Sequence, residues 1–248
     1  MSAGDRQTVI CMKWGPRYGA DYTNRLWGMI RRNTARDTRL ICFTDNPDGI
    51  DSAVECRPLP HVTLPERHAM KGWRKIALWN RDLGLEGDLL FMDLDLVITG
   101  SIDGFFDHAP EESYVVIRNW TQPDKRIGNT SVYRFRVGAH HDVYERLMAD
   151  PEGVSDAYPN SQTYISSNIS SMAFWPEDWC VSFKHSLIPR WPLNFVRDVP
   201  LPETARVVAF TGKPDPDEAA IGVWPAKGYK KLYKHVRPTQ WITDLWRE

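Results

Sequence analysis

Short apolar runs separated by polar, turn-forming segments recur along the first part of the chain. Thr8–Met12 and Leu40–Phe43 are rich in residues that favour β-strands. Between them, apolar side chains recur at helical spacing at Tyr22, Leu26, Met29 and Ile30. This strand–helix–strand opening predicts a parallel α/β sheet.

The same pattern predicts the elements that follow. We expect a helix from about residue 70 to 83 and a short helix after Ser101, both flanking an apolar run at 89–98. Further strands are predicted at 114–117, 131–135 and 206–210, with a helix at 142–148; residues 150–200 show weak periodicity. Because no shift in composition marks a boundary, we predict one α/β domain over residues 1–248, with a mostly parallel twisted central sheet flanked by helices.

Two aspartates interrupt the longest apolar run. Asp93 and Asp95 lie two residues apart within Leu89–Ile98, which predicts one buried strand. Side chains at i and i+2 of a strand share a face, so the carboxylates would lie roughly 7 Å apart. Buried carboxylates need a proton or a cation, and a divalent metal with oxygen ligands satisfies both. The alternative is one aspartate capping a turn and the other solvated on an edge strand.

Composition narrows the function classes. The 248 residues include 31 basic and 32 acidic side chains, which argues against wholesale nucleic-acid binding. The four cysteines show no CxxC spacing and favour reduced, packed thiols of a cytoplasmic protein. Met1–Gln7 contains no apolar core of a signal peptide, and no stretch is long enough to cross a bilayer. Motifs of hydrolase triads, P-loop ATPases, Rossmann dehydrogenases and HExxH metalloproteases are missing from the sequence.

Several polar residues next to predicted strands are candidates for binding. Lys75, on the helix before the aspartates, could neutralise a phosphate or simply be a solvated lysine. Lys213, in the turn Thr211–Pro214, could clamp a phosphate or belong to an ordinary turn. Asn129, at the mouth of a strand, could contact a sugar or only shape a turn.

Near the C-terminus, basic and aromatic residues alternate. Lysines and an arginine at 227, 230, 231, 234 and 237 are interleaved with Tyr229, Tyr233 and Trp241. The favoured interpretation is a terminal helix whose aromatics pack on the sheet while its lysines face water. The other is a surface for anionic lipid or an anionic acceptor.

The segment Trp73–Trp79, followed by Phe91–Asp103 and Phe106, resembles the GT-A-fold nucleotide-sugar glycosyltransferases. It is similar to the family-8 enzymes that include glycogenin and the bacterial galactosyltransferases of lipopolysaccharide synthesis. In that family a lysine-bearing helix precedes a strand that ends in a DxD motif. The resemblance implies a Rossmann-like nucleotide-binding half, and it implies that Asp93 and Asp95 hold Mn²⁺ or Mg²⁺ on the diphosphate of a UDP-sugar.

The resemblance extends in order along the chain. It implies that Met12 and Trp14, at the first strand–helix junction, contact the nucleoside, and that Lys75 and Lys213 steady the donor. Asn129 and Gln162 would then contact the donor sugar, with Gln162 among the catalytic residues beside Asp93 and Asp95.

At two positions the chain departs from the family pattern. Thr211, or Ala209 under a shifted alignment, replaces a metal-binding histidine, and Ser161 replaces an aspartate near the anomeric carbon. Asp156 or Asp178 could substitute for that aspartate. We therefore assign no nucleophile and no stereochemical outcome.

Together these features predict a cytoplasmic, metal-dependent glycosyltransferase that acts on the hydroxyl of a glycan, glycolipid or other acceptor. Trp175 and Trp179 would lie over the acceptor sugar, and the basic C-terminal segment could reach the inner membrane face. The alternative is a glycosyltransferase-like protein that binds a nucleotide sugar without turnover. A two-metal nuclease or phosphatase is less favoured, because the sequence shows no second acidic cluster.

Overall fold

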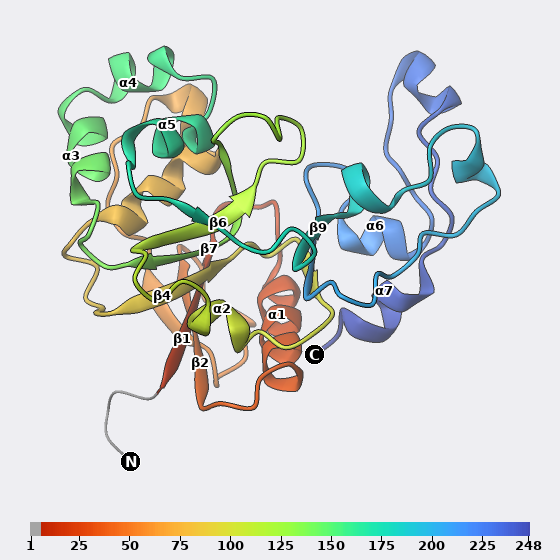
Figure 1. Ribbon diagram of the computed structural model, residues 1–248, viewed down its shortest axis with the longest axis horizontal. Coiled ribbons are helices and arrows are strands. Elements are labelled where there is room, and N and C mark those ends of the chain that lie inside the picture. The colour runs from red at the N-terminus through yellow and green to blue at the C-terminus, as the bar shows by residue number, and fades with distance from the viewer. Residues whose placement is uncertain (1–5) are drawn as a thin grey trace.

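The computed structural model describes residues 6–248, so residues 1–5 of the N-terminal segment considered above lie outside the described part. Its main feature is a seven-stranded sheet with the order β3-β2-β1-β4-β7-β6-β8 (Figure 1). The strands β1 to β4 are mutually parallel, and β7 runs antiparallel to both β4 and β6. The predicted mostly parallel α/β sheet is therefore confirmed. Its strands are β1 Gln7–Lys13, β2 Thr38–Thr44, β3 Glu55–Pro58, β4 Asp88–Met92, β6 Tyr114–Arg118, β7 Gly128–Arg136 and β8 Ala173–Phe174.

A second, three-stranded sheet lies beside the first. It consists of β5 Leu96–Ile98, β10 Val207–Ala209 and β9 Cys180–Ser182, with β10 antiparallel to β5 and parallel to β9. The prediction of one continuous strand over 89–98 is wrong, because the chain leaves the main sheet after Met92 and enters the small sheet at Leu96. An apolar run indicates burial but does not say which sheet pairs with each half.

The described helices are short apart from α1. They are α1 Ala20–Arg32, α2 Gly104–Asp107, α3 His141–Ala149, α4 Pro151–Ala157, α5 Ser161–Asn168, α6 Pro216–Ala220 and α7 Gln240–Leu245. Single turns of 3₁₀ helix occur at η1 Glu66–His68, η4 Leu193–Phe195 and η5 Gly228–Leu232, and a π-helical turn at η3 Phe183–Leu187. The helix predicted from 70 to 83 is instead the 3₁₀ helix η2 Gly72–Trp79.

Two helices lie in the region with weak periodicity. The short helix α4 starts with Pro151 and is capped by Asp150, whose side chain accepts a hydrogen bond from the backbone of Gly153. Asn160 caps α5 in the same way through Thr163. Local capping residues therefore mark these helices where hydrophobic periodicity does not.

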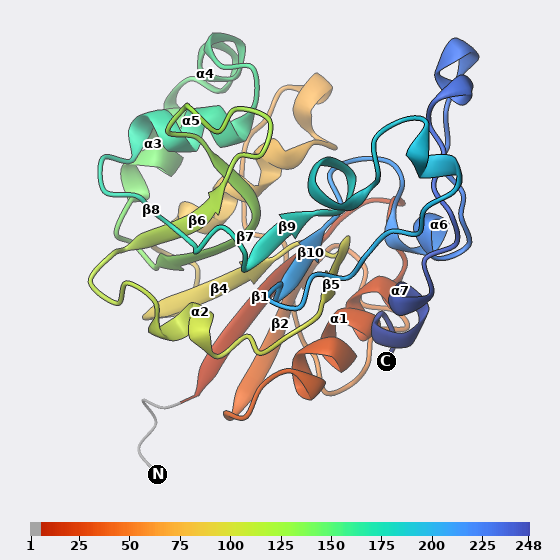
Figure 2. The same ribbon diagram turned by 45° about the vertical axis from the view of Figure 1, so that its right-hand side comes forward.

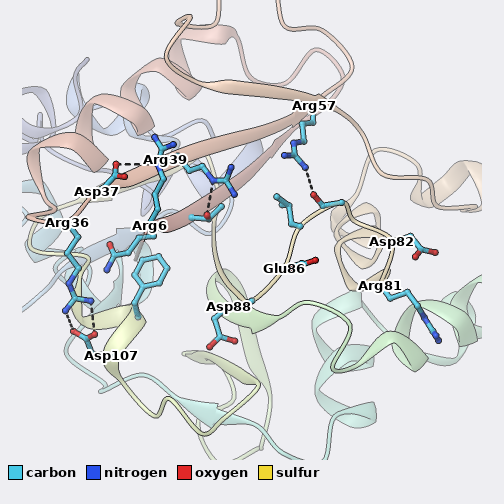
Figure 3. A pocket seen from close by; sticks show the side chains of 16 residues that line it. Arg6, Arg36, Asp37, Arg39, Arg57, Arg81, Asp82, Glu86, Asp88 and Asp107 are labelled. Carbon is cyan, nitrogen blue, oxygen red and sulfur yellow. Dashed lines mark hydrogen bonds and ion pairs between the residues drawn. The ribbon is translucent and has the colours of Figure 1, made fainter. Parts of the chain in front are cut away.

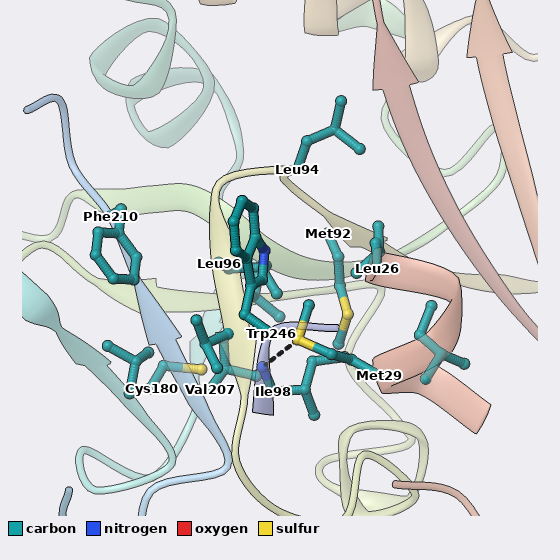
Figure 4. Packing of buried hydrophobic residues seen from close by; sticks show 14 of the residues in the cluster. Leu26, Met29, Met92, Leu94, Leu96, Ile98, Cys180, Val207, Phe210 and Trp246 are labelled. Carbon is teal, nitrogen blue, oxygen red and sulfur yellow. Dashed lines mark hydrogen bonds between the residues drawn. The ribbon is translucent and has the colours of Figure 1, made fainter. Parts of the chain in front are cut away.

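The main sheet is covered on both faces, which is why β1 is buried along its whole length. Val9 and Cys11 face α1 and the small sheet, whereas Ile10 and Met12 face η2, α3 and α5. On the first face, Leu26 and Met29 of α1 pack with residues from β4, β5, β10 and the C-terminus (Figure 4). These residues are Met92, Leu96, Ile98, Val207, Phe210 and Trp246.

The C-terminal part of the chain forms a lobe to one side of the sheet, around α6 and α7 (Figures 1 and 2). Trp241 and Trp246 pack into the hydrophobic core, as the favoured interpretation of this segment requires. Tyr229 and Leu232 do not, because their side chains are 72% and 76% exposed. The prediction that the aromatics of this segment pack on the sheet is therefore wrong for η5, which projects at the upper right in both views.

The four cysteines are free thiols, and three of them are buried. No helix within residues 6–248 is long and apolar enough to span a bilayer. The expectation of one domain over residues 1–248 stays a prediction.

Candidate active site

Asp93 and Asp95 lie in the crossover from β4 to β5, at the carboxyl end of β4, where parallel α/β sheets place their ligand sites. Hydrogen bonds fix both ends of this crossover: Asp93 N donates to Ser131 O at 2.8 Å, and Phe210 N donates to Asp95 O at 3.1 Å. Both aspartates line one cavity of about 360 Å³. The pair thus reaches one cavity, although through a sheet-to-sheet crossover and not from one face of a strand.

Two other segments complete this cavity. Met12, Trp14, Arg17 and Tyr18 come from the end of β1 and the loop before α1. The other wall consists of Met70, Lys71, Gly72 and Lys75, at the start of η2 and just before it. The structure therefore brings together five of the predicted site residues: Met12, Trp14, Lys75, Asp93 and Asp95.

The first aspartate is paired with Lys75. The Nζ of Lys75 lies 2.5 Å from Oδ1 and 2.7 Å from Oδ2 of Asp93, and it also donates to the carbonyl of Thr130 at 3.2 Å. The ammonium group lies 5.0 Å from the ring centroid of Phe91. Lys75 is therefore a buried, fully engaged cation that orients Asp93, and it is not free in the cavity.

The second aspartate has weaker compensation. The hydroxyl of Tyr18 donates to Oδ2 of Asp95 at 2.8 Å, and Nη2 of Arg17 lies 3.9 Å from the same oxygen. Burial, and then the negative charge of Asp93, raise the pKa of Asp95 to about 7 despite these neighbours. The charge of Asp95 is thus less well compensated than that of Asp93, and a cation bound beside it would favour the ionised carboxylate.

The donor set around the pair consists of oxygen atoms. Within residues 6–248, no three or more histidine, cysteine, aspartate or glutamate side chains form a metal-binding group. Thr211 follows Phe210 on the strand end paired with Asp95, and its Oγ1 lies 3.4 Å from Oγ of Ser182. The Thr211 hydroxyl does not line the cavity. The two carboxylates fit Mg²⁺ or Mn²⁺, which prefer oxygen and complete their shell with water or phosphate.

Three predicted residues lie near this cavity but not in its wall. The side chain of Asn129 accepts a hydrogen bond from Ser131 N at 3.0 Å, so it shapes the start of β7. Gln162 lies in the first turn of α5, next to Ser161, whose Oγ would be 3.4 Å from a Cβ at Gly72. Lys213 is bound to Asp215 and Glu218 at 2.8 and 2.5 Å.

Four other side chains that we expected to take part in the reaction do not line this cavity. Asp156 is paired with Arg67 at 2.5 Å, and neither Asp156 nor Asp178 lines the cavity. Trp175 is buried in the core and donates to Val132 O at 3.2 Å, so it is not an open platform for a sugar. Trp179 lies against the Arg206 guanidinium, 3.6 Å from the ring centroid.

Arg17, Tyr18 and Lys71 were missed by the sequence analysis. Gly15 and Pro16, directly after the first strand, were a signal for a loop at the carboxyl edge of the sheet. Gly15 takes a φ of 62° and packs against the Met70 side chain, so that this turn closes one side of the cavity.

A larger hollow, of about 1520 Å³, lies at the opposite edge, where β1, β2 and β4 begin (Figure 3). Its arginines are engaged by carboxylates: Arg6 by Asp37 at 3.4 Å, and Arg39 and Arg57 by Glu55 at 3.4 and 2.6 Å. Because these arginines are paired with carboxylates and the hollow is open to solvent, it is a less favoured ligand site than the cavity at the aspartates.

No family model matches the sequence, and no curated protein matches it. The fold is nevertheless similar to solved glycosyltransferases. The galactosyltransferase LgtC, solved with donor and acceptor sugar analogues, superposes with a TM-score of 0.59 at 10% identity over 85% of this chain and 89% of LgtC. GlyE of Streptococcus pneumoniae gives 0.59 at 12% identity, covering 85% of this chain and 56% of GlyE. The bifunctional glycosyltransferase WbbM gives 0.54 at 12% identity, covering 86% and 47%.

These likenesses confirm the GT-A fold that the motif resemblance implied. This chain spans about half of the length of GlyE and WbbM.

Proposed function

We propose that this protein is a metal-dependent glycosyltransferase that moves a sugar from a nucleotide-sugar donor, a UDP-sugar, to an acceptor hydroxyl on a glycan or glycolipid. The observation that carries the proposal is the carboxylate pair Asp93 and Asp95 at the sheet edge, in one cavity with basic and aromatic side chains. The GT-A fold supports it, and in LgtC a glycosyltransferase of this fold was solved with donor and acceptor sugar analogues.

The residues of the cavity have separate tasks in this proposal. Asp93 and Asp95 would hold Mn²⁺ or Mg²⁺, which stabilises the negative charge on the departing nucleoside diphosphate. Lys75 keeps Asp93 oriented through its contacts to both carboxylate oxygens, and the Tyr18 hydroxyl does the same for Asp95. Met12 and Trp14 provide an apolar wall for the nucleoside.

The remaining predicted residues act around that centre. Gln162, at the start of α5 behind Gly72, would contact the transferred sugar, and Asn129 would assist from the start of β7. Lys213 would reach the diphosphate after leaving Asp215 and Glu218, and its side chain is 46% exposed.

The alternative is a protein that binds a nucleotide sugar without turning it over. Ser161 and Thr211, where the family pattern has an aspartate and a histidine, favour it. Hydrolysis of UDP-sugars in water distinguishes the two, because metal-dependent release of UDP requires a competent site.

We also propose peripheral contact with the inner face of the membrane, through a surface that we call the basic–apolar patch (residues 227–234). Tyr229 and Leu232 are exposed in it beside Lys227, Lys230 and Lys231. Exposed aromatic and aliphatic groups next to lysines suit an anionic lipid surface, which would keep a cytoplasmic enzyme near a glycolipid acceptor.

Titration of UDP by isothermal calorimetry, with and without Mn²⁺, tests the enzyme proposal. We expect Mn²⁺ to tighten UDP binding, and Asp93→Asn to remove this gain while the melting temperature shows the variant folded. Asp178→Asn is the matched control, because that aspartate is exposed and lies outside the cavity. Equal Mn²⁺-dependent affinity for the parent and Asp93→Asn would contradict the proposal.

A further inference from the structure

Arg17 is a cation of the cavity that the proposed mechanism does not use. It lies in the loop between β1 and α1, which is tied down by a hydrogen bond from Gly15 N to Asp45 Oδ2 at 2.9 Å. The Nη2 atom of Arg17 lies 3.2 Å from Oδ1 of Asp215 and 3.9 Å from Oδ2 of Asp95. Its guanidinium also covers the ring of Tyr18, 4.7 Å from the centroid. One side chain thus joins the carboxylate pair to the loop after β10.

Asp215 gives Arg17 a fixed position. The Asp215 side chain is 7% exposed and caps α6 in a reciprocal capping box with Glu218. Its other oxygen accepts from Lys213 at 2.8 Å. A buried carboxylate held at several points restricts the guanidinium bound to it, so Arg17 is oriented before any ligand arrives.

The guanidinium still has donors to offer. Within residues 6–248, the hydrogen bond and ion pairs of Arg17 all involve Nη2, and the side chain remains 56% exposed in the cavity. Lys75, by contrast, is engaged by Asp93 and the Thr130 carbonyl. Lys71 lines the same cavity but is exposed and has no ion pair within the described chain. Arg17 therefore combines free donors with a fixed orientation.

We propose that Arg17 binds the diphosphate of the donor directly and supplies a fixed positive charge beside Asp95. This inference rests on the proposed function, and it gives the nucleoside diphosphate a part of its affinity that does not depend on metal. A planar guanidinium binds phosphate oxygens through paired N–H donors, which a lysine cannot reproduce. Its distance of 3.9 Å from Asp95 places this charge beside the carboxylate pair.

The test compares UDP with uridine, by calorimetry, in buffer with EDTA and then in Mn²⁺. We expect the parent to bind UDP measurably in EDTA, and Arg17→Ala to weaken this binding roughly 10- to 100-fold, as expected for lost hydrogen bonds between charged groups. Uridine affinity should stay unchanged, because uridine has no phosphate. Arg17→Lys should recover only part of the loss. The charge control Lys125→Ala, at an exposed site outside the cavity, should cost less than about 3-fold.

Three outcomes would overturn the inference: no UDP binding by the parent in EDTA, equal UDP affinity in Arg17→Ala, or an equal loss for UDP and uridine, which indicates a loop packing defect. Equal losses in Lys125→Ala and Arg17→Ala would also contradict it, since net charge alone would explain them. The proposed function fails separately, when Mn²⁺ does not tighten UDP binding to the parent or when Asp93→Asn retains that gain.

Discussion

At the scale of single residues, the two aspartates of the crossover have different neighbours. Asp93 has both oxygens on the ammonium group of Lys75, whereas Asp95 has a neutral hydroxyl from Tyr18 and a guanidinium at 3.9 Å. When no cation is bound, the charge on Asp95 therefore destabilises the folded protein more than the charge on Asp93 does. The carboxylate that the proposed metal site needs at this position thus lowers the stability of the metal-free protein.

This conflict predicts a pH-dependent effect of Asp95→Asn in the presence of EDTA. The pKa of Asp95 is raised from 3.8 to about 7 in the folded state. Ionisation of Asp95 therefore lowers the free energy of unfolding progressively from about pH 4 to pH 7. Above that range the whole decrease persists. We expect Asp95→Asn to raise the free energy of unfolding at pH 8 by on the order of 2–4 kcal/mol.

Denaturant unfolding at pH 4 and pH 8 measures this effect. The gain should fall below about 1 kcal/mol at pH 4, because this pH is close to the ordinary value of 3.8 and little of the cost has developed there. Asp178→Asn, an exposed control, should change little at either pH. A gain of equal size at both pH values would show that ionisation is not its cause.

At the scale of elements, short segments owe their positions to residues on distant strands. The helix α2 has only four residues, which is too short to be stable by itself. Arg134 on β7, with a side chain among the largest that are fully buried, donates hydrogen bonds to carbonyls in and after this helix. The carbonyls belong to Phe105, Phe106, His108, Ala109 and Glu112, at 2.6 to 3.3 Å.

This network predicts that Arg134→Lys destabilises the protein although it keeps the charge. A lysine has one nitrogen in place of the fork and would leave several buried carbonyls without donors, so we expect a loss of about 2–4 kcal/mol. Arg136→Lys is the control on the same strand, because Arg136 mainly pairs with a partly exposed Asp88 at 2.9 Å. It should cost less than about 1 kcal/mol. Chemical denaturation of both variants measures these changes in the free energy of unfolding. Equal losses would contradict the assigned role of the guanidinium.

At the scale of the whole molecule, the lobe after β9 differs from the rest in its surface. The exposed large apolar side chains of the described chain are concentrated in it, including Trp191, Val196, Ile221, Tyr229 and Leu232. The basic–apolar patch forms its outer end in Figures 1 and 2. In the proposed function, the edge of the sheet with the two aspartates is the catalytic site, and the basic–apolar patch is a separate surface for lipid.

Vesicle co-sedimentation tests the use of that surface. We expect the protein to sediment with vesicles that contain phosphatidylglycerol and not with pure phosphatidylcholine, and binding to weaken in salt. Lys231→Glu should reduce binding about 10-fold, whereas Lys125→Glu, an exposed site outside the patch with the same change in charge, should have little effect. Tyr229→Ser should weaken the contact at high salt. Equal binding of Lys231→Glu and Lys125→Glu would indicate nonspecific attraction.

Much of the fold and part of the site could be predicted from local patterns. The first strands and α1 were predicted because apolar residues recur with a regular period, and Asp93 and Asp95 were found because charge is rare inside an apolar run. The motif around Lys75 then indicated the GT-A fold. Residues such as Arg17 and Asp215 carry no such signal, since their partners lie far away in sequence.

The sequence by itself determined which segments are buried, where the carboxylate pair lies and which fold class can bury those segments. Only the tertiary structure decided that the run 89–98 divides between two sheets, that Lys75 is engaged by Asp93, and that residues 198 positions apart, Arg17 and Asp215, meet beside Asp95. The physical reason is that hydrophobic burial depends on composition and period, which are local. The pairing of charges depends on where the backbone brings distant segments together.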